Sequence, residues 1–355
     1  MMTLRPPGIL PPSLHVVLAA IGERLEQQRP IEPELAARLS EIHGLPPATV
    51  VKAEREIADA ARLFHWRRAS PLLVRLFAPR PTDLSQLSEV DGLEYVFLFH
   101  RDGHIREAAL RKIAGALPSA FAFAAICWRL NDWAQPVRNA AAKCAARSFA
   151  VTSAPIVAEA ALALLAREVS WGRWADEKIV FEKALGRIDV REALSEAIVS
   201  RTTGPTARVL RAALRGDGLD SYLPRIAREA IQPEVRALAA KTLIDEQASW
   251  PNGWQWRWID KWAGVRRHEL TFARRDVVAT ASKESLIAAC AADKAAVVRK
   301  VALSSLIRFS LGSAQARTIA ASLANDPSQS VRDKAKFILR SQAESIVVIG
   351  EKIAN

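Results

Sequence analysis

Residues 293–302 read DKAAVVRKVA, and the same phrase recurs along the chain: a turn residue, an aliphatic residue followed by arginine, and alanines at helical spacing. Further copies lie at residues 102–109 (DGHIREAA), 132–141 (DWAQPVRNAA), 232–237 (QPEVRA) and 326–335 (DPSQSVRDKA). Where the turn residue is Asp, it can cap the following helix by accepting a free N–H group. The aliphatic residue and the alanines form one stripe that packs against a companion helix. The phrase therefore predicts a repeated helical pair.

The arginines of the phrase keep a regular spacing. The interval is 32 residues from Arg106 to Arg138 and 33 residues from Arg299 to Arg332. Weaker copies that we assign to the same register are Val74-Arg75, Val265-Arg266 and degenerate copies near Arg173 and Arg208. Each arginine is therefore expected at an equivalent place in its repeat, where it can donate to turn carbonyls or to the aspartate of a neighbour.

This pattern resembles the HEAT family, in particular its bacterial short-repeat form with an Asp-x-x-Val-Arg-x-x-Ala phrase. The resemblance covers residues 66–340 and implies an all-α fold, an α-solenoid (superhelix) of about eight or nine HEAT-like helical pairs. It also implies that the repeated arginines, Arg106, Arg138, Arg236, Arg299 and Arg332, have a structural role first and face a ligand only second. Residues 341–355 are expected to form a C-terminal capping helix. HEAT solenoids serve many unrelated functions, so the resemblance says little about the ligand.

Residues 1–65 differ from the repeats and predict an N-terminal three-helix bundle that caps or docks, with residues 1–12 loose. Within it, residues 34–39 (ELAARL) and 44–52 (GLPPATVVK) are similar to a helix-turn-helix. Residues 45–50 also resemble a phrase of the thioredoxin-like iron–sulfur subunits of NADH dehydrogenases, whose cysteine ligands are absent here. A capping bundle, a DNA-reading element and a protein-docking element are the three interpretations.

The charge of the chain is unevenly placed. The net charge is +12, yet residues 1–65 hold 7 Lys/Arg against 8 Asp/Glu, so the basic excess belongs to the repeats. Three cysteines, Cys127, Cys144 and Cys290, lie in apolar helical runs and are expected to be buried thiols rather than disulfides or zinc ligands. No stretch is long and apolar enough for a membrane span, so a cytoplasmic protein with no membrane partner is expected.

Ten tryptophans cluster beside basic residues, and these clusters are the candidate partner-binding sites. The densest run is residues 250–262 (WPNGWQWRWIDKW), an interruption of the helical repeats. From it and from its basic neighbours we select Trp254, Trp256, Arg257, Trp258, Lys261, Trp262, Arg266, Arg267, Arg274 and Arg275. Two smaller groups complete the set: Trp66, Arg67 and Arg68, and Trp171, Arg173 and Trp174. Rigid aromatics beside arginines suit protein hot spots or base stacking, whereas the alternative is that the indoles fill an irregular joint.

The sequence shows no phosphate-binding glycine loop, no metal-ligand spacing and no nucleophile motif, so we assign no catalytic residue, cofactor or metal. The leading interpretation is a non-enzymatic binding or scaffold module whose basic, Trp-rich surface binds a protein with an acidic surface. The alternative is DNA or RNA binding along a basic concave groove. One form of this alternative is a protein similar to the HEAT-like alkylpurine DNA glycosylases. The oligomeric state is left open.

Overall fold

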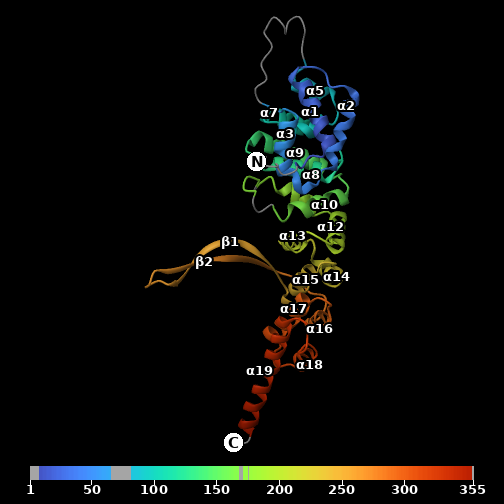
Figure 1. The fold of residues 1–355 in the computed structure, drawn as a ribbon. Helices are drawn as coiled ribbons and strands as arrows, with labels where there is room; N and C mark the ends of the chain where they lie inside the picture. Colours follow the sequence, from blue (N-terminus) through green and yellow to red (C-terminus); the bar gives the residue numbers. More distant parts are fainter. Residues whose placement is uncertain (1–7, 65–80, 168–170, 175, 354–355) are drawn as a thin grey trace, which may run out of the picture. The chain divides into compact units, whose positions relative to one another are not determined.

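The computed structural model describes residues 8–64, 81–167, 171–174 and 176–353, with side chains as far as Gln342. Within these ranges the chain is mostly helical, with one two-stranded antiparallel sheet (Figure 1). The expectation of a purely helical fold is therefore corrected at one place, the tryptophan-rich interruption. None of the described helices combines the length and the apolarity that a membrane crossing requires.

The chain divides into two compact units, Met1–Leu194 and Ser195–Asn355. The division falls inside one helix. The described elements of the first unit are α1 (Pro12–Glu26), α2 (Pro33–Ala37), η1 (Arg38–Gly44), η2 (Pro47–Thr49), α3 (Val50–Ala60), α5 (Asp83–Glu89), α6 (Leu93–Phe97), α7 (Gly103–Lys112), α8 (Ala120–Leu130), α9 (Gln135–Ser148), α10 (Ala154–Leu164), α11 (Ile179–Leu185) and the start of α12 (Ile188–Ser200).

The N-terminal helices are packed into the first unit. Helix α3 contacts α8, and the short η2 contacts both α8 and α10. The carboxylate of Glu56 accepts hydrogen bonds from the N–H groups of Ile9 (2.7 Å) and Leu10 (3.0 Å), and Leu10 is buried. Residues 8–12 are therefore held in place rather than loose, while residues 1–7 lie outside the described ranges.

The second unit consists of helical pairs and one hairpin. Its described elements are α13 (Thr206–Ala213), η4 (Asp220–Tyr222), α14 (Leu223–Glu229), α15 (Pro233–Asp245), β1 (Gln247–Asp260), β2 (Val265–Asp276), α16 (Lys283–Ala291), α17 (Ala296–Phe309), α18 (Ala314–Ser322) and α19 (Gln329–Ile353). Helix α14 contacts α15, α16 contacts α17, and α18 contacts α19, while α17 also contacts both α15 and α19. The C-terminal residues continue α19, the second helix of the last pair, and do not begin a separate helix.

The repeated arginines have one geometry. In each case Nη1 donates to the carbonyl oxygens of the residues six and five positions earlier, in the turn before the helix. The five arginines that share it are Arg106, Arg138, Arg236, Arg299 and Arg332. Each of these side chains therefore ties its helix to the turn that precedes it, as the sequence register predicted.

Three of these arginines also bind an aspartate of the next repeat through Nε and Nη2. The pairs are Arg106 with Asp132 (2.9 and 2.8 Å), Arg236 with Asp293 (2.8 and 2.9 Å), and Arg299 with Asp326 (2.6 and 2.8 Å). Each aspartate in turn accepts the N–H of the residue two positions later, on Ala134, Ala295 and Ser328. A two-point bond between a guanidinium and a carboxylate fixes orientation as well as distance. The Arg–Asp pairs therefore join successive repeats.

The spacing of the pairs shows where the repeat is interrupted. Arg299 and Asp326 are 27 residues apart, whereas Arg236 and Asp293 are 57 residues apart. The hairpin Gln247–Asp276 accounts for the additional 30 residues. Arg266, assigned above to a weak copy of the phrase, lies in β2, so that assignment is wrong. The hairpin is an insertion between the helices α15 and α16.

Candidate functional site: an inserted tryptophan and arginine hairpin

The hairpin begins where α15 ends. Glu246 adopts a left-handed conformation (φ 52°), which ends the helix, and the N–H of Val277 donates to its carbonyl (2.9 Å). The two strands pair from Gln247 opposite Asp276 to Asp260 opposite Val265. At the far end, the Asp260 carboxylate accepts from the N–H groups of Trp262 and Ala263, and Gly264 takes a positive φ of 65°. Aspartate and glycine are the residue types that such turns favour.

One face of the hairpin is aromatic. Because side chains alternate along a strand, Trp254, Trp256 and Trp258 share a face. Their cross-strand partners are Leu270, His268 and Arg266, and Phe272 continues the same face along β2. The His268 ring stacks on Trp256, with 4.7 Å between centroids, and the Arg266 guanidinium lies 4.5 Å from the centroid of the same indole. We call these seven residues the aromatic face.

The aromatic face is exposed. Trp254, Trp256 and Trp258 expose 61%, 57% and 50% of their surface, and Phe272 exposes 51%. Trp262, in the turn, is fully exposed. Figure 1 shows the hairpin extending away from α15 and α17 of the same unit. Exposed contiguous aromatic surface of this kind is characteristic of interaction sites. The interpretation that these indoles fill a joint between repeats is therefore wrong.

The opposite face is polar and basic. Gln255 faces Glu269 across the strands, and Arg257 faces Arg267 directly. Glu269 accepts from Arg267 Nε (2.9 Å), and its other oxygen lies 3.6 Å from Arg257. Like charges placed opposite each other destabilise a hairpin, and one carboxylate compensates them in part. We call Gln255, Arg257, Arg267 and Glu269, together with Lys261 in the turn, the polar face.

The root of the hairpin is fixed by Arg275. Its guanidinium binds both carboxylate oxygens of Asp220 (2.8 and 2.6 Å) and the carbonyls of Leu214 and Gly216. The hydrogen bonds that Arg275 donates to the Asp220 carboxylate raise the pKa of Arg275 above its ordinary value. Ala248, on β1, is completely buried beside this clamp. Arg275 was a predicted binding residue, and its bonds instead give it a structural role.

The remaining predicted residues fall elsewhere. Trp171 and Trp174 are buried in the first unit, where Trp171 contacts Trp128 (5.2 Å between centroids) and Trp174 packs near Phe181 (5.7 Å). Their indoles fill the core and present no binding surface. Arg173 between them is exposed. Trp66, Arg67 and Arg68 lie outside the described residues.

The spacing of the tryptophans contains a signal that our sequence interpretation did not use. Trp254, Trp256 and Trp258 alternate with Gln255 and Arg257, the period of a strand and not of a helix. Comparisons of the chain with protein-family models, with curated proteins and with solved structures found no significant match.

Proposed function

We propose that this chain is a binding module in which a HEAT-type helical repeat holds an inserted hairpin whose aromatic face docks onto a protein with an acidic surface. The observation that carries the proposal is the exposure of Trp254, Trp256 and Trp258 on an element that the repeat does not need. The HEAT-type assignment is supported by the recurring arginine geometry and by the Arg–Asp pairs between successive repeats.

The insertion argues for a role other than stability. The Arg236–Asp293 pair closes the repeat across the hairpin with the same geometry as the uninterrupted Arg299–Asp326 pair. An isolated two-stranded hairpin is only marginally stable in water. A partner that covers the exposed aromatic face would therefore stabilise the hairpin. Tryptophan and arginine are also the residues that most often dominate the binding energy of protein interfaces.

The charge of the hairpin indicates the chemistry of the partner. Residues 247–276 contain six Lys/Arg and three Asp/Glu, so the element is basic. Arg266 and Arg274 lie on the aromatic side of β2 and are exposed, and Lys261 is exposed in the turn. An apolar groove bordered by carboxylates would cover the indoles and pair with these cations at once. Such charge complementarity speeds association and selects the partner.

A protein is favoured over a nucleic acid by the way the indoles are stacked. His268 and Arg266 already lie against Trp256, and His268 also lies beside Trp254, 5.1 Å away, so a base would have to compete with them for part of the stacking surface. On the polar face, Glu269 offsets Arg257 and Arg267, which weakens their attraction for phosphates. Leu270 and Phe272 add apolar surface that bases do not require.

The test compares capture of partners by three forms of the full chain from extract of the native host, with and without nuclease treatment. The aromatic-face variant carries Trp254→Ala, Trp256→Ala and Trp258→Ala, and the polar-face control carries Gln255→Ala, Arg257→Ala and Arg267→Ala. We expect the wild type to retain a discrete acidic protein, the aromatic-face variant to lose it, and the control to retain it with weaker dependence on salt. Equal capture by all three forms, or capture only of nuclease-sensitive material, overturns the proposal.

A further inference from the structure

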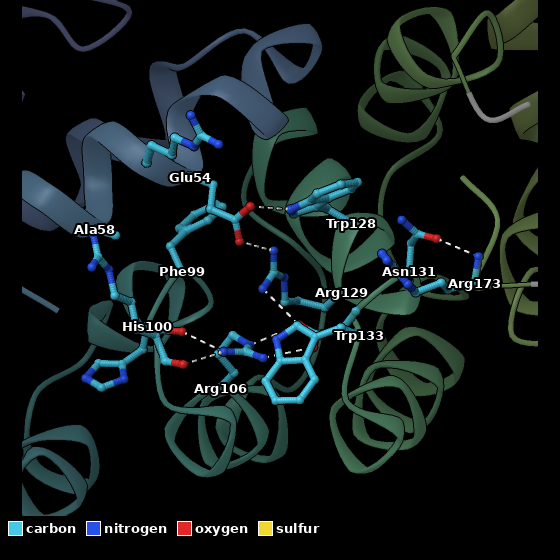
Figure 2. Close-up of a pocket in the computed structure, with 13 residues that line it drawn as sticks. Glu54, Ala58, Phe99, His100, Arg106, Trp128, Arg129, Asn131, Trp133 and Arg173 are labelled. Atoms are coloured by element: carbon cyan, nitrogen blue, oxygen red, sulfur yellow. Dashed lines mark hydrogen bonds and ion pairs between the residues drawn. The ribbon is translucent and has the colours of Figure 1, made fainter. Parts of the chain in front are cut away.

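The first unit contains a cavity that is independent of the hairpin. Its volume is about 400 Å³, within the range of small-ligand sites. Helices α3, α7 and α8, the segment after α6, the turn between α8 and α9 and the segment around residue 173 meet there (Figure 2). It is lined by Glu54, Arg55, Ala58, Phe99, His100, Arg101, Arg106, Trp128, Arg129, Asn131, Asp132, Trp133 and Arg173. Five of these side chains are arginines, and only two are carboxylates.

Both carboxylates already have partners. Asp132 accepts from Arg106 through two N–H groups, from Arg129 Nη1 (2.9 Å) and from the N–H of Ala134 (3.0 Å). Glu54 accepts from the Trp128 indole N–H (3.0 Å) and from Arg129 Nη2, and Figure 2 shows these two bonds side by side. The acidic groups of the cavity are thus used to hold its own walls.

Two arginines remain available to a ligand. Arg55, on α3, and Arg173 are exposed, and neither side chain has an ion-pair partner among the described residues. The backbone N–H of Arg173 donates to the Asn131 side chain (2.9 Å), and this is its one hydrogen bond among the described residues. Unpaired guanidinium groups that line a cavity favour an anion, and their planar forks match the oxygens of a phosphate.

The cavity also presents an exposed indole. Trp133 exposes 70% of its surface, although its backbone is fixed on both sides by the bonds of Asp132 and by Arg138 Nη1, which donates to its carbonyl. Figure 2 shows the Trp133 ring in front of Arg106, whose guanidinium carbon lies 5.9 Å from the centroid of that ring. The face of Trp133 turned away from Arg106 is left for another planar group.

We propose that this cavity binds a nucleotide-like ligand, a planar heterocycle stacked on Trp133 with a phosphate held by Arg55 and Arg173. Stacking of a base on an aromatic side chain and phosphate binding by arginine are complementary contributions to one affinity. The ligand can be a free nucleotide or a nucleotide at the end of a single strand, since both carry the same two groups.

The test is titration calorimetry of the full chain with adenosine monophosphate, adenosine, inorganic phosphate and a short single-stranded oligonucleotide. We expect the monophosphate to bind more tightly than adenosine or phosphate alone. If only a strand is bound, the oligonucleotide saturates and the free monophosphate does not, and the proposal then holds for the strand end. If neither the monophosphate nor the oligonucleotide saturates, the proposal is wrong.

Variants connect any binding to the cavity. Trp133→Ala is expected to weaken binding about tenfold, the change that about 1.4 kcal/mol produces, and Trp133→Phe to restore most of it. Arg173→Ala is expected to weaken the binding of the monophosphate more than the binding of adenosine. Arg208→Ala, an exposed arginine outside the cavity, serves as the matched control and should leave binding unchanged. Equal affinities for all four variants would place the ligand elsewhere and overturn the assignment.

Discussion

Replacing Asp132 with asparagine removes the charge on which two arginines of the first unit depend. The side chain of Asp132 is 1% exposed, and those of Arg106 and Arg129 are 4% and 5% exposed. Asparagine keeps the shape of the residue, but it presents one N–H₂ group to guanidinium groups that also only donate. Two buried cations then lose a carboxylate partner at once.

The expected loss is about 3 kcal/mol in the free energy of unfolding, because removing one partner of a buried ion pair costs roughly 3–5 kcal/mol. We choose the lower end, since Arg106 keeps the carbonyls of His100 and Arg101 and Arg129 keeps Glu54.

The assay is equilibrium urea unfolding of the full chain, followed by the shift of tryptophan emission, to which the buried Trp171 and Trp174 of the same unit contribute because unfolding exposes them to water. Asp59→Asn is the matched control. The Asp59 side chain is 63% exposed in its pair with Arg101, and an exposed pair contributes about 0–1 kcal/mol. A loss below about 1 kcal/mol for Asp132→Asn, or equal losses for both variants, would refute the view that the Arg–Asp pairs hold the repeats together.

Three further predictions concern pH, packing and thiol chemistry. The pKa of Asp326 lies below its ordinary value because Arg299 donates hydrogen bonds to its carboxylate. The stabilising contribution of Asp326 is therefore complete above about pH 4, the unfolded pKa, and is lost as pH falls through the folded pKa. The difference in melting temperature between wild type and Asp326→Asn should shrink from pH 7 to pH 3, and a constant difference contradicts this. Trp171→Ala should lower the free energy of unfolding in urea by about 3 kcal/mol or more because it empties a core site, whereas Trp258→Ala on the hairpin should leave the midpoint unchanged. The reverse order would contradict the assigned burial. Burial raises the pKa of Cys144 and of Cys290 to about 11, so an aromatic disulfide reagent at pH 8 should label neither thiol until the chain is unfolded, and rapid labelling of the native chain would contradict their burial.

The helical class and the recurring arginine contacts were predictable because their signal is local and repeats along the sequence. An aliphatic residue, an arginine and alanines at fixed offsets describe one helix, and the same offsets place Arg106, Arg236 and Arg299 in one geometry. All three cysteines are buried, as their apolar surroundings predicted. The partner of each arginine was harder to foresee, since Asp293 lies 57 residues from Arg236 across the hairpin.

The hairpin was located by composition but its structure was not predicted. The weak repeat copy at Arg266 kept the register by coincidence, because the insertion is about one repeat long. Exposure also could not be read from composition: Trp171 and Trp256 have similar basic neighbours, yet the first is 8% exposed and the second 57%. The cavity was missed for a related reason, since Arg55 and Trp133 lie far apart in sequence and line one cavity through the packing of α3 on α8.

Site-specific photo-crosslinking tests the docking role of the aromatic face most directly. A benzophenone side chain is introduced at Trp256 in one form of the full chain and at Arg257 in another, because these neighbours lie on opposite faces of β1. We predict that irradiation in nuclease-treated host extract gives a crosslinked protein from position 256 and much less from position 257, with aspartate and glutamate beside the crosslinked residue. Equal yields from both positions, or no protein adduct at position 256, would contradict docking through the aromatic face.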